Sequence, residues 1–285
     1  MRVALTGADG FTGRYVAEAL TAAGATCVAL SADLLDGAAI DRAVAETDLD
    51  RVIHLAAKAF VGDADWVSFY QVNQLGTYRL LDAIARHRPG ARVIIASSAQ
   101  VYGPGATGLI AEGAPTRPAN HYALSKLAAE WGAARWNDRL QLAVTRPFNY
   151  TGVGQGDEYL IPKIVAHFRR RTERIELGNT WVQRDFGDVR SVASAYAGLV
   201  LADEIPDVIN LATGRVSSIG DIVQILEGLS GHRMDVAVNP AFVRANDVPV
   251  LGGDIARLRA TLPHWEARTL EDTLAWMYNN ERTSE

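Results

Sequence analysis

The chain has 285 residues, of which 48% are hydrophobic and 21% charged, and its formal net charge is −5 at pH 7. This length can bury a sizeable core, and the composition is ordinary for a soluble globular protein. The net negative charge argues against a nucleic-acid partner, and no apolar run reaches the roughly 20 residues that span a bilayer. We therefore expect a globular protein with neither a nucleic-acid nor a membrane partner.

The single cysteine, Cys27, excludes an internal disulfide and lies in an apolar run, where we expect it to be a small core residue. The N-terminal residues run directly into a predicted strand and carry no signal-peptide pattern. A cytoplasmic location is the expectation. No spacing of His, Cys and carboxylate residues suggests a metal site.

Short apolar runs alternate with amphipathic segments along the first half of the chain. In chain order the pattern predicts strand 3–6, helix 14–23, strand 27–30, helix 40–46, strand 51–56, helix 66–86, strand 92–96, helix 121–136 and strand 142–145. A last strand is predicted at 208–211. Continuous apolar strands that alternate with helices indicate a parallel sheet covered on both faces. The predicted fold class is α/β, a Rossmann-like doubly wound parallel sheet.

The pattern loosens after Pro147, where glycine-rich loops and scattered prolines interrupt short elements. We expect a smaller, mainly C-terminal lobe here that binds the substrate. The predicted division assigns 1–148 and 183–214 to a dinucleotide-binding domain, and 149–182 and 215–285 to the lobe.

Three glycines, Gly7, Gly10 and Gly13, follow the first predicted strand and precede the first predicted helix. Glycine allows a tight turn and the close approach of backbone to a pyrophosphate, while the free N–H groups of the helix N-terminus attract the phosphates. This strand–turn–helix context makes a dinucleotide-binding loop the preferred interpretation over an ordinary turn.

An acidic residue that holds the ribose hydroxyls is expected about 20 residues further on. Asp33 is one candidate. We prefer the interpretation that Asp33 and Leu34 begin the next connection and face the adenine ring. The small Ser31 in place of an acid leaves room for a 2′-phosphate, which favours NADP, with NAD as the alternative.

Tyr122 and Lys126 are four residues apart, so on a helix they lie on one face, one turn apart. The lysine charge and the charge of a nicotinamide should lower the phenol pKa, which would let the tyrosine exchange a proton with an alcohol oxygen. Ser97 and Ser98 end the strand 92–96, at the edge where ligands bind in open α/β sheets.

Taken together, six motifs resemble the extended short-chain dehydrogenase/reductases that act on nucleotide sugars. They are GxxGxxG at 7–13, HLAA at 54–57, NQLGT at 73–77, SSAQVYG at 97–103, YxxxK at 122–126 and RPFN at 146–149. The resemblance implies a catalytic triad of Ser98, Tyr122 and Lys126. It also implies further cofactor contacts, namely Phe11, Thr12, Leu55, Ala56, Ala57, Asn73 and Pro147.

The second half is most similar to the GDP-4-keto-6-deoxymannose reductases, in the segments 149–155, 161–165, 177–179, 184–189 and 244–249. By that similarity Asn149 faces the sugar and diphosphate. Lys163, Arg184 and Arg244 are implied to hold the nucleotide, and guanidinium and ammonium groups do suit a diphosphate. The implied reaction is NADPH-dependent reduction of the 4-keto group of GDP-4-keto-6-deoxymannose, which gives GDP-rhamnose or its C4 epimer.

Related 4,6-dehydratases carry an acid where this chain has Gln100, and an amide cannot act as a general acid. Dehydration is therefore not expected, and Gln100 becomes a substrate contact. Three alternatives stay open: the same reduction on a dTDP- or CDP-linked sugar, epimerisation with bound NAD, and, more remotely, an NADP sensor without catalysis.

The resemblance also implies a homodimer, in which the helix that carries Tyr122 and the preceding long helix pair across a two-fold axis. Their outer faces are expected to include the apolar residues Phe69, Leu80, Leu81, Leu127 and Trp131.

Overall fold

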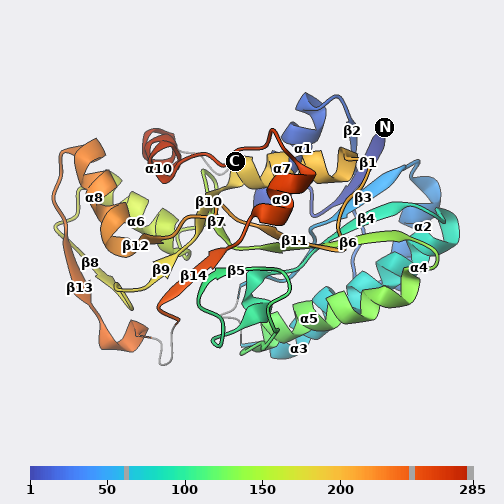
Figure 1. Ribbon diagram of the computed structural model, residues 1–285, viewed down its shortest axis with the longest axis horizontal. Helices are drawn as coiled ribbons and strands as arrows, with labels where there is room; N and C mark the ends of the chain where they lie inside the picture. The colour runs from blue at the N-terminus through green and yellow to red at the C-terminus, as the bar shows by residue number, and fades with distance from the viewer. Residues whose placement is uncertain (61–63, 244–247, 281–285) are drawn as a thin grey trace.

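The computed structural model describes residues 1–60, 64–243 and 248–280. Its centre is a six-stranded sheet in which every neighbouring pair is parallel (Figure 1). The strand order is β11 (Val208–Leu211), β6 (Gln141–Pro147), β4 (Arg92–Ala96), β3 (Arg51–His54), β1 (Arg2–Thr6) and β2 (Thr26–Ala29). The chain leaves β1 toward β2 on one side and then returns past β1 to β3. This reversal confirms the predicted Rossmann-like doubly wound sheet.

Helices cover both faces of this sheet, as a parallel sheet requires. One face carries α1 (Phe11–Ala22) and α7 (Val189–Leu201), and the other carries α2 (Gly37–Glu46), α4 (Thr77–His87) and α5 (His121–Ala133) (Figure 1). The first helix begins at Phe11, three residues before its predicted start, because Gly10 serves as its N-cap.

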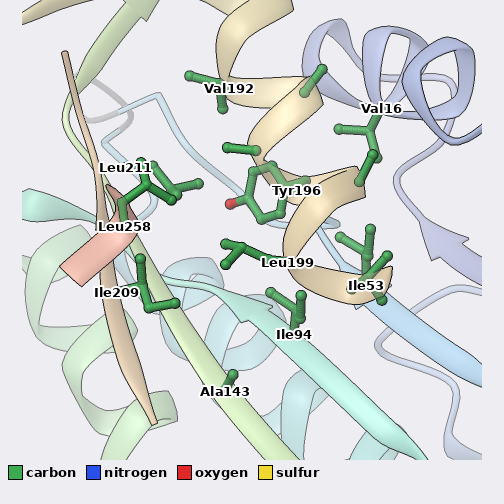
Figure 2. Close-up of a cluster of buried hydrophobic side chains, with 14 of the residues drawn as sticks. Val16, Ile53, Ile94, Ala143, Val192, Tyr196, Leu199, Ile209, Leu211 and Leu258 are labelled. Atoms are coloured by element: carbon green, nitrogen blue, oxygen red, sulfur yellow. The ribbon is translucent and has the colours of Figure 1, made fainter. Parts of the chain in front are cut away.

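Apolar side chains of α1, α7 and the strands fill the space on the first face (Figure 2). Tyr196 lies in the middle of this cluster and is 1% exposed. Its phenol forms a hydrogen bond of 2.9 Å with the hydroxyl of Thr145 on β6, so the one polar atom of this ring has a partner. The pair anchors α7 to the sheet strand whose end reaches the predicted site.

The predicted helix 66–86 is wrong in detail, because it is interrupted. It consists of α3 (Trp66–Phe69), a π-helical segment η1 (Tyr70–Gly76) and α4. A methyl group at Gly76 would lie 2.7 Å from the Leu34 side chain, so the helix can approach the end of β2 only at a glycine. Asn73 is in the π-helical segment, and such segments are frequent at functional sites.

Three of the five residues expected on the outer faces of a dimer were assigned wrongly. Phe69, Leu80 and Leu81 are at most 2% exposed and pack inside the chain. Leu127 is half-buried, whereas Trp131 is 75% exposed. Phe69 packs against the Tyr122 ring of α5, and Leu80 and Leu81 pack in the core with α2 and the sheet strands.

A second layer of structure lies beyond the carboxyl end of the sheet (Figure 1). It holds α6 (Leu160–Arg169), α8 (Ile219–Ser230) and α10 (Leu270–Asn279), which share an apolar core. Its strand pairs are β7 (Asn149–Thr151) with β10 (Phe186–Asp188) and β8 (Arg174–Leu177) with β13 (Asp235–Val238).

A small mixed sheet connects this layer to the first half of the chain. Its order is β12 (Ser217–Ser218), β9 (Gln183–Arg184), β14 (Val250–Gly253) and β5 (Gly108–Ile110). The strand β5 comes from the loop after β4, so the two parts of the chain interlock here. The division into two domains remains a prediction. Within the described residues, no helix is both long enough and apolar enough to cross a membrane.

Candidate active site

Ser98 and Tyr122 meet at the carboxyl end of the sheet. Ser98 follows β4, and Tyr122 is the second residue of α5, whose N-cap is Asn120. The Tyr122 phenol hydrogen-bonds Ser98, and the two side chains are 9% and 8% exposed. The Lys126 ammonium lies one turn further along α5 and donates to the carbonyl of Ala96 at 2.8 Å. All three predicted triad residues are therefore anchored around the end of β4.

The expectation that the Tyr122 pKa falls is wrong for the groups that the protein itself supplies. Burial raises the pKa of Tyr122 well above its ordinary value, and the hydrogen bond to Ser98 offsets only part of that rise. The Lys126 charge is not one of the groups that shift the Tyr122 pKa. The phenol is thus protonated at neutral pH, the state from which it can donate a proton, and a nearby positive charge would be needed to ease that transfer.

Burial acts in the opposite direction on Lys126 and lowers its pKa to about 8, against a smaller raising effect of the Glu130 carboxylate. A buried ammonium is costly because it loses its hydration. Lys126 is charged at neutral pH but loses its charge near pH 8.

Asn73 supports this region from the π-helical segment and is 1% exposed. Its amide group donates to the hydroxyl of Ser125 at 3.1 Å and to the carbonyl of Lys58 at 3.0 Å, and its oxygen accepts from the Lys58 N–H at 2.8 Å. Asn73 therefore ties the loop after β3 to the helix that carries Tyr122.

His54, at the end of β3, has a structural role. Its two ring nitrogens contact the hydroxyls of Thr6 at 2.7 Å and Thr77 at 2.9 Å. Burial and the Lys126 charge lower the His54 pKa to about 3, so the ring is neutral. It connects three segments next to the glycine loop.

The glycine loop fits a dinucleotide pyrophosphate. Gly7 has a φ of +69°, and a methyl group at Gly13 would lie 2.0 Å from the carbonyl oxygen of Gly7. The N-cap residue of α1 is Gly10, which has no side chain, so no side chain caps the first N–H groups of this helix. Uncapped N–H groups at a helix N-terminus attract phosphate oxygens.

Phe11 and Thr12, the other two loop residues expected at the cofactor, both contact Tyr150 of β7. The rings of Phe11 and Tyr150 stack at 6.2 Å, and the two hydroxyls of Thr12 and Tyr150 are 2.8 Å apart. Tyr150 was missed in the sequence, although it follows Asn149 directly. It joins the glycine loop to the strand expected to face the sugar.

The remaining predicted cofactor residues lie along the same edge. Asp33 is exposed and accepts a hydrogen bond from the N–H of Leu35 at 2.9 Å. Leu34 is buried, and its carbonyl accepts a hydrogen bond from Arg79 of α4 at 3.0 Å. Leu55, Ala56, Ala57 and Pro147 are half-buried at the ends of β3 and β6. Their roles stay predictions.

The predicted substrate residues are spread over the second layer. Asn149 is exposed at the start of β7. The Lys163 ammonium lies 3.3 Å from the carbonyl of Glu176 and 5.3 Å from the centre of the Phe242 ring. Arg184 donates to the carbonyl of Val248 at 2.7 Å. Arg244 lies outside the described residues.

A buried polar network joins α5 to β6 and β11 near the triad, and it was not predicted from the sequence. The Arg146 guanidinium of β6 makes two hydrogen bonds to the Glu130 carboxylate of α5, at 2.6 and 3.1 Å. It also donates to the hydroxyl of Tyr102, which in turn donates to the side chain of Asn210 at 2.7 Å. Burial opposes the charge of Arg146, but Glu130 more than compensates and raises the Arg146 pKa.

Known proteins are similar to this chain over nearly its whole length. The model of the GDP-mannose 4,6-dehydratase family matches residues 28–277. The GDP-6-deoxy-D-talose 4-dehydrogenase of Aggregatibacter actinomycetemcomitans is 32% identical, with 98% of each chain covered. The GDP-6-deoxy-D-mannose reductase of Pseudomonas aeruginosa is also 32% identical, with 95% of this chain and 99% of the relative covered.

Solved structures agree. RMD from Pseudomonas aeruginosa, complexed with NADPH, superposes with a TM-score of 0.88 at 30% identity, covering 98% of this chain and 97% of the other. A Burkholderia cenocepacia J2315 protein described as a candidate epimerase superposes with a TM-score of 0.92 at 41% identity, with 98% and 97% covered. The chain belongs to the GDP-mannose 4,6-dehydratase family, and the prediction of an NAD(P)-dependent oxidoreductase of the extended short-chain type is confirmed.

Proposed function

We propose that this enzyme reduces the 4-keto group of a GDP-linked 4-keto-6-deoxyhexose with NADPH. The observation that carries the proposal is the placement of the buried Tyr122 phenol against the Ser98 hydroxyl, with the Lys126 ammonium one helical turn away. Reduction of a ketone needs a proton donor at the carbonyl oxygen, and a protonated phenol supplies it.

Each triad residue has one role in this proposal. Tyr122 donates its proton to the carbonyl oxygen, and Ser98 holds that oxygen with its hydroxyl as negative charge develops. Lys126, which donates to the carbonyl of Ala96 one helical turn along α5, supplies the positive charge of the triad as the phenol loses its proton. The dinucleotide, held at Gly7, Gly10 and Gly13, supplies the hydride when bound.

Dehydration is not part of this proposal, despite the name of the family. Gln100 lies two residues after Ser98 in the short helix η2 (Ala99–Tyr102), and its backbone N–H donates to the Ser98 hydroxyl at 3.2 Å. An uncharged amide at this position cannot transfer the proton that elimination of water needs. Two relatives act as a GDP-sugar dehydrogenase and a reductase, which agrees with 4-keto chemistry.

Epimerisation with bound NAD is the second candidate, because one similar structure is described as a candidate epimerase. An epimerase must first take a proton from the sugar hydroxyl, for which it needs a phenolate. Net consumption of NADPH distinguishes the two candidates, because the phenolate forms in both reactions, after proton donation in the reductase and before proton abstraction in the epimerase.

The test is NADPH oxidation with a panel of 4-keto-6-deoxyhexoses linked to GDP, dTDP and CDP. We expect one NADPH consumed per sugar reduced, with the GDP sugar preferred. Interconversion of sugar epimers without net NADPH consumption would replace this proposal with the epimerase.

The base preference has its own test, since it rests on the similarity of the second half alone. GDP and dTDP are compared as ligands that raise the thermal unfolding midpoint. Stabilisation follows RT ln(1 + [L]/Kd), so a hundredfold affinity difference is resolved at equal concentration. Protection by dTDP and not by GDP would remove the GDP assignment and leave the reductase.

We also propose a homodimer, on the basis of exposed apolar residues on α3, the π-helical segment and α5. Trp66 and Val67 of α3, Leu75 of the π-helical segment, and Leu124 and Trp131 of α5 are each more than 40% exposed. Large exposed apolar side chains gathered on neighbouring elements are typical of protein interfaces. We expect a dimer in light scattering at micromolar concentration, and a monomer after Trp131→Glu.

A further inference from the structure

Gln100 and Asn120 form a contact that joins the two segments of the active site. The amide nitrogen of Asn120 donates to the side-chain oxygen of Gln100 at 3.0 Å. Gln100 lies two residues after Ser98, and Asn120 lies two residues before Tyr122. The same two segments are therefore joined twice, by this contact and by the hydrogen bond between Ser98 and Tyr122.

The capping role of Asn120 fixes which way its own amide points. Its side-chain oxygen accepts from the backbone N–H of Ala123 at 2.8 Å, as the N-cap of α5. A backbone N–H can only donate, so the atom facing Ala123 must be the oxygen. The other end of the Asn120 amide is then the NH2 group, which faces Gln100.

The same reasoning fixes Gln100. A donor from Asn120 requires an acceptor opposite it, so the Gln100 oxygen faces Asn120 and its NH2 group points away. Gln100 is exposed, and among the described residues no side chain or carbonyl accepts a hydrogen bond from this NH2 group. A helix cap thereby makes Gln100 a hydrogen-bond donor of fixed orientation next to Ser98.

We propose that Asn120 is a positioning residue that orients the Gln100 amide so that its NH2 group donates to an oxygen of the substrate hexose. This rests on the proposed function, since the ligand is the sugar of a nucleotide sugar. The oriented donor selects hexoses that present a hydroxyl or carbonyl oxygen beside the carbon that reacts at Ser98 and Tyr122. It also explains why an amide is useful at this position, since a carboxylate could not donate.

Two substitutions of Asn120 separate orientation from capping. Asn120→Ser keeps a capping oxygen for Ala123 but leaves the Gln100 amide without an orienting donor. Asn120→Asp also keeps the cap, but its carboxylate attracts the Gln100 NH2 group and turns the amide the wrong way. We expect KM for the nucleotide sugar to rise about threefold to tenfold in Asn120→Ser, by the loss of one hydrogen bond, and further in Asn120→Asp. Because the contact is made before and during the reaction, kcat should change much less.

The control is the Gln100→Ala background. If Asn120 acts through Gln100, neither Asn120→Ser nor Asn120→Asp adds to the effect of Gln100→Ala, so the double-mutant cycle is fully non-additive. Thermal unfolding midpoints of all variants should stay close together, because each retains the cap. Additive effects on KM, or a loss of kcat with unchanged KM, would overturn the inference.

The cycle is run with whichever nucleotide sugar the wild-type enzyme turns over, by reduction or by epimerisation, so that failure of the reductase proposal alone does not affect it. In parallel, GDP-mannose is compared with GDP in thermal protection, and the extra protection from the sugar should fall in the same non-additive way. If the wild type neither turns over nor binds any nucleotide sugar, both proposals fail. If it does and the effects are additive, only the role of Asn120 and Gln100 fails.

Discussion

Glu130 and Lys126 are buried charged groups about one helical turn apart on α5, but only Glu130 contacts a group of opposite charge. Glu130 is paired with Arg146 by two hydrogen bonds, and the network continues through Tyr102 to Asn210. Lys126 is equally buried, but its hydrogen bond goes to the neutral carbonyl of Ala96, and its pKa is lowered to about 8. Tyr122 likewise has a strongly shifted pKa.

This difference between Glu130 and Lys126 indicates which residues stabilise the fold and which serve the reaction. A buried charge with a full set of partners holds the structure together, whereas a buried charge without an opposite charge in contact costs stability. Such costs are accepted at catalytic sites, where shifted pKa values are useful. Substitutions in the network should therefore change folding, and substitutions in the triad should change the reaction.

The largest expected effect is on turnover. Tyr122→Phe should lower kcat by roughly 10²–10⁴-fold, because proton donation is lost while the ring remains in place. NADPH binding, measured by fluorescence titration, and the unfolding free energy should change little. Near-full turnover in this variant would show that Tyr122 is not the proton donor.

Glu130→Ala should produce the largest effect on folding. It leaves the Arg146 guanidinium buried without its carboxylate, and breaking such a pair costs about 3–5 kcal/mol. Urea unfolding measures this loss. The matched control is Asp41→Ala, which removes an exposed partner of Arg86 and should cost at most about 1 kcal/mol. Equal losses in the two variants would contradict the distinction between the two regions.

A smaller effect concerns Lys126 and the pH dependence of stability. Its pKa is lowered from 10.5 to about 8 by folding, so between these values the unfolded chain binds more protons than the native protein. Wild-type stability from this group therefore rises as pH increases from about 8 to 10.5. Relative to Lys126→Met, the wild type should gain up to roughly 3 kcal/mol over this interval. A stability difference that is constant with pH would show that the Lys126 pKa is not shifted.

The smallest and most local effect is on the pH profile of turnover. Because Lys126 loses its charge near pH 8, kcat should fall as pH rises through that value. The measurement is kcat at saturating substrate between pH 6 and 10. A profile that is flat up to pH 10 would remove Lys126 from the charge balance of the reaction.

The sequence allowed the parallel sheet to be predicted, because its strands are local apolar runs, and the resemblance supplied Ser98, Tyr122 and Lys126, whose catalytic roles stay predictions. The interrupted helix around Asn73 was not predictable, because it depends on the close approach of Gly76 to Leu34, which lies far away in sequence. Phe69, Leu80 and Leu81 were misplaced because their partners on α5, α2 and the sheet are distant in sequence.

The missed polar contacts have a similar cause. Glu130 and Arg146 are 16 residues apart, and Thr12 and Tyr150 are 138 residues apart, so only the packed fold shows that they meet. The direction of the Tyr122 pKa shift also depends on burial, which residue spacing does not report. The spacing of Tyr122 and Lys126 suggested that a positive charge lowers the Tyr122 pKa, whereas in the folded protein desolvation raises that pKa.

The most direct test of the central claim is transfer of deuterium from NADPH that carries deuterium at both C4 positions of the nicotinamide. The enzyme is mixed with this cofactor and GDP-4-keto-6-deoxymannose, and the product is analysed by mass spectrometry and NMR. We predict one deuterium at sugar C4 for each NADPH consumed, with incorporation roughly 10²–10⁴-fold slower in Tyr122→Phe. A product without deuterium, or turnover without net consumption of NADPH, would contradict the assignment of this enzyme as a 4-keto reductase.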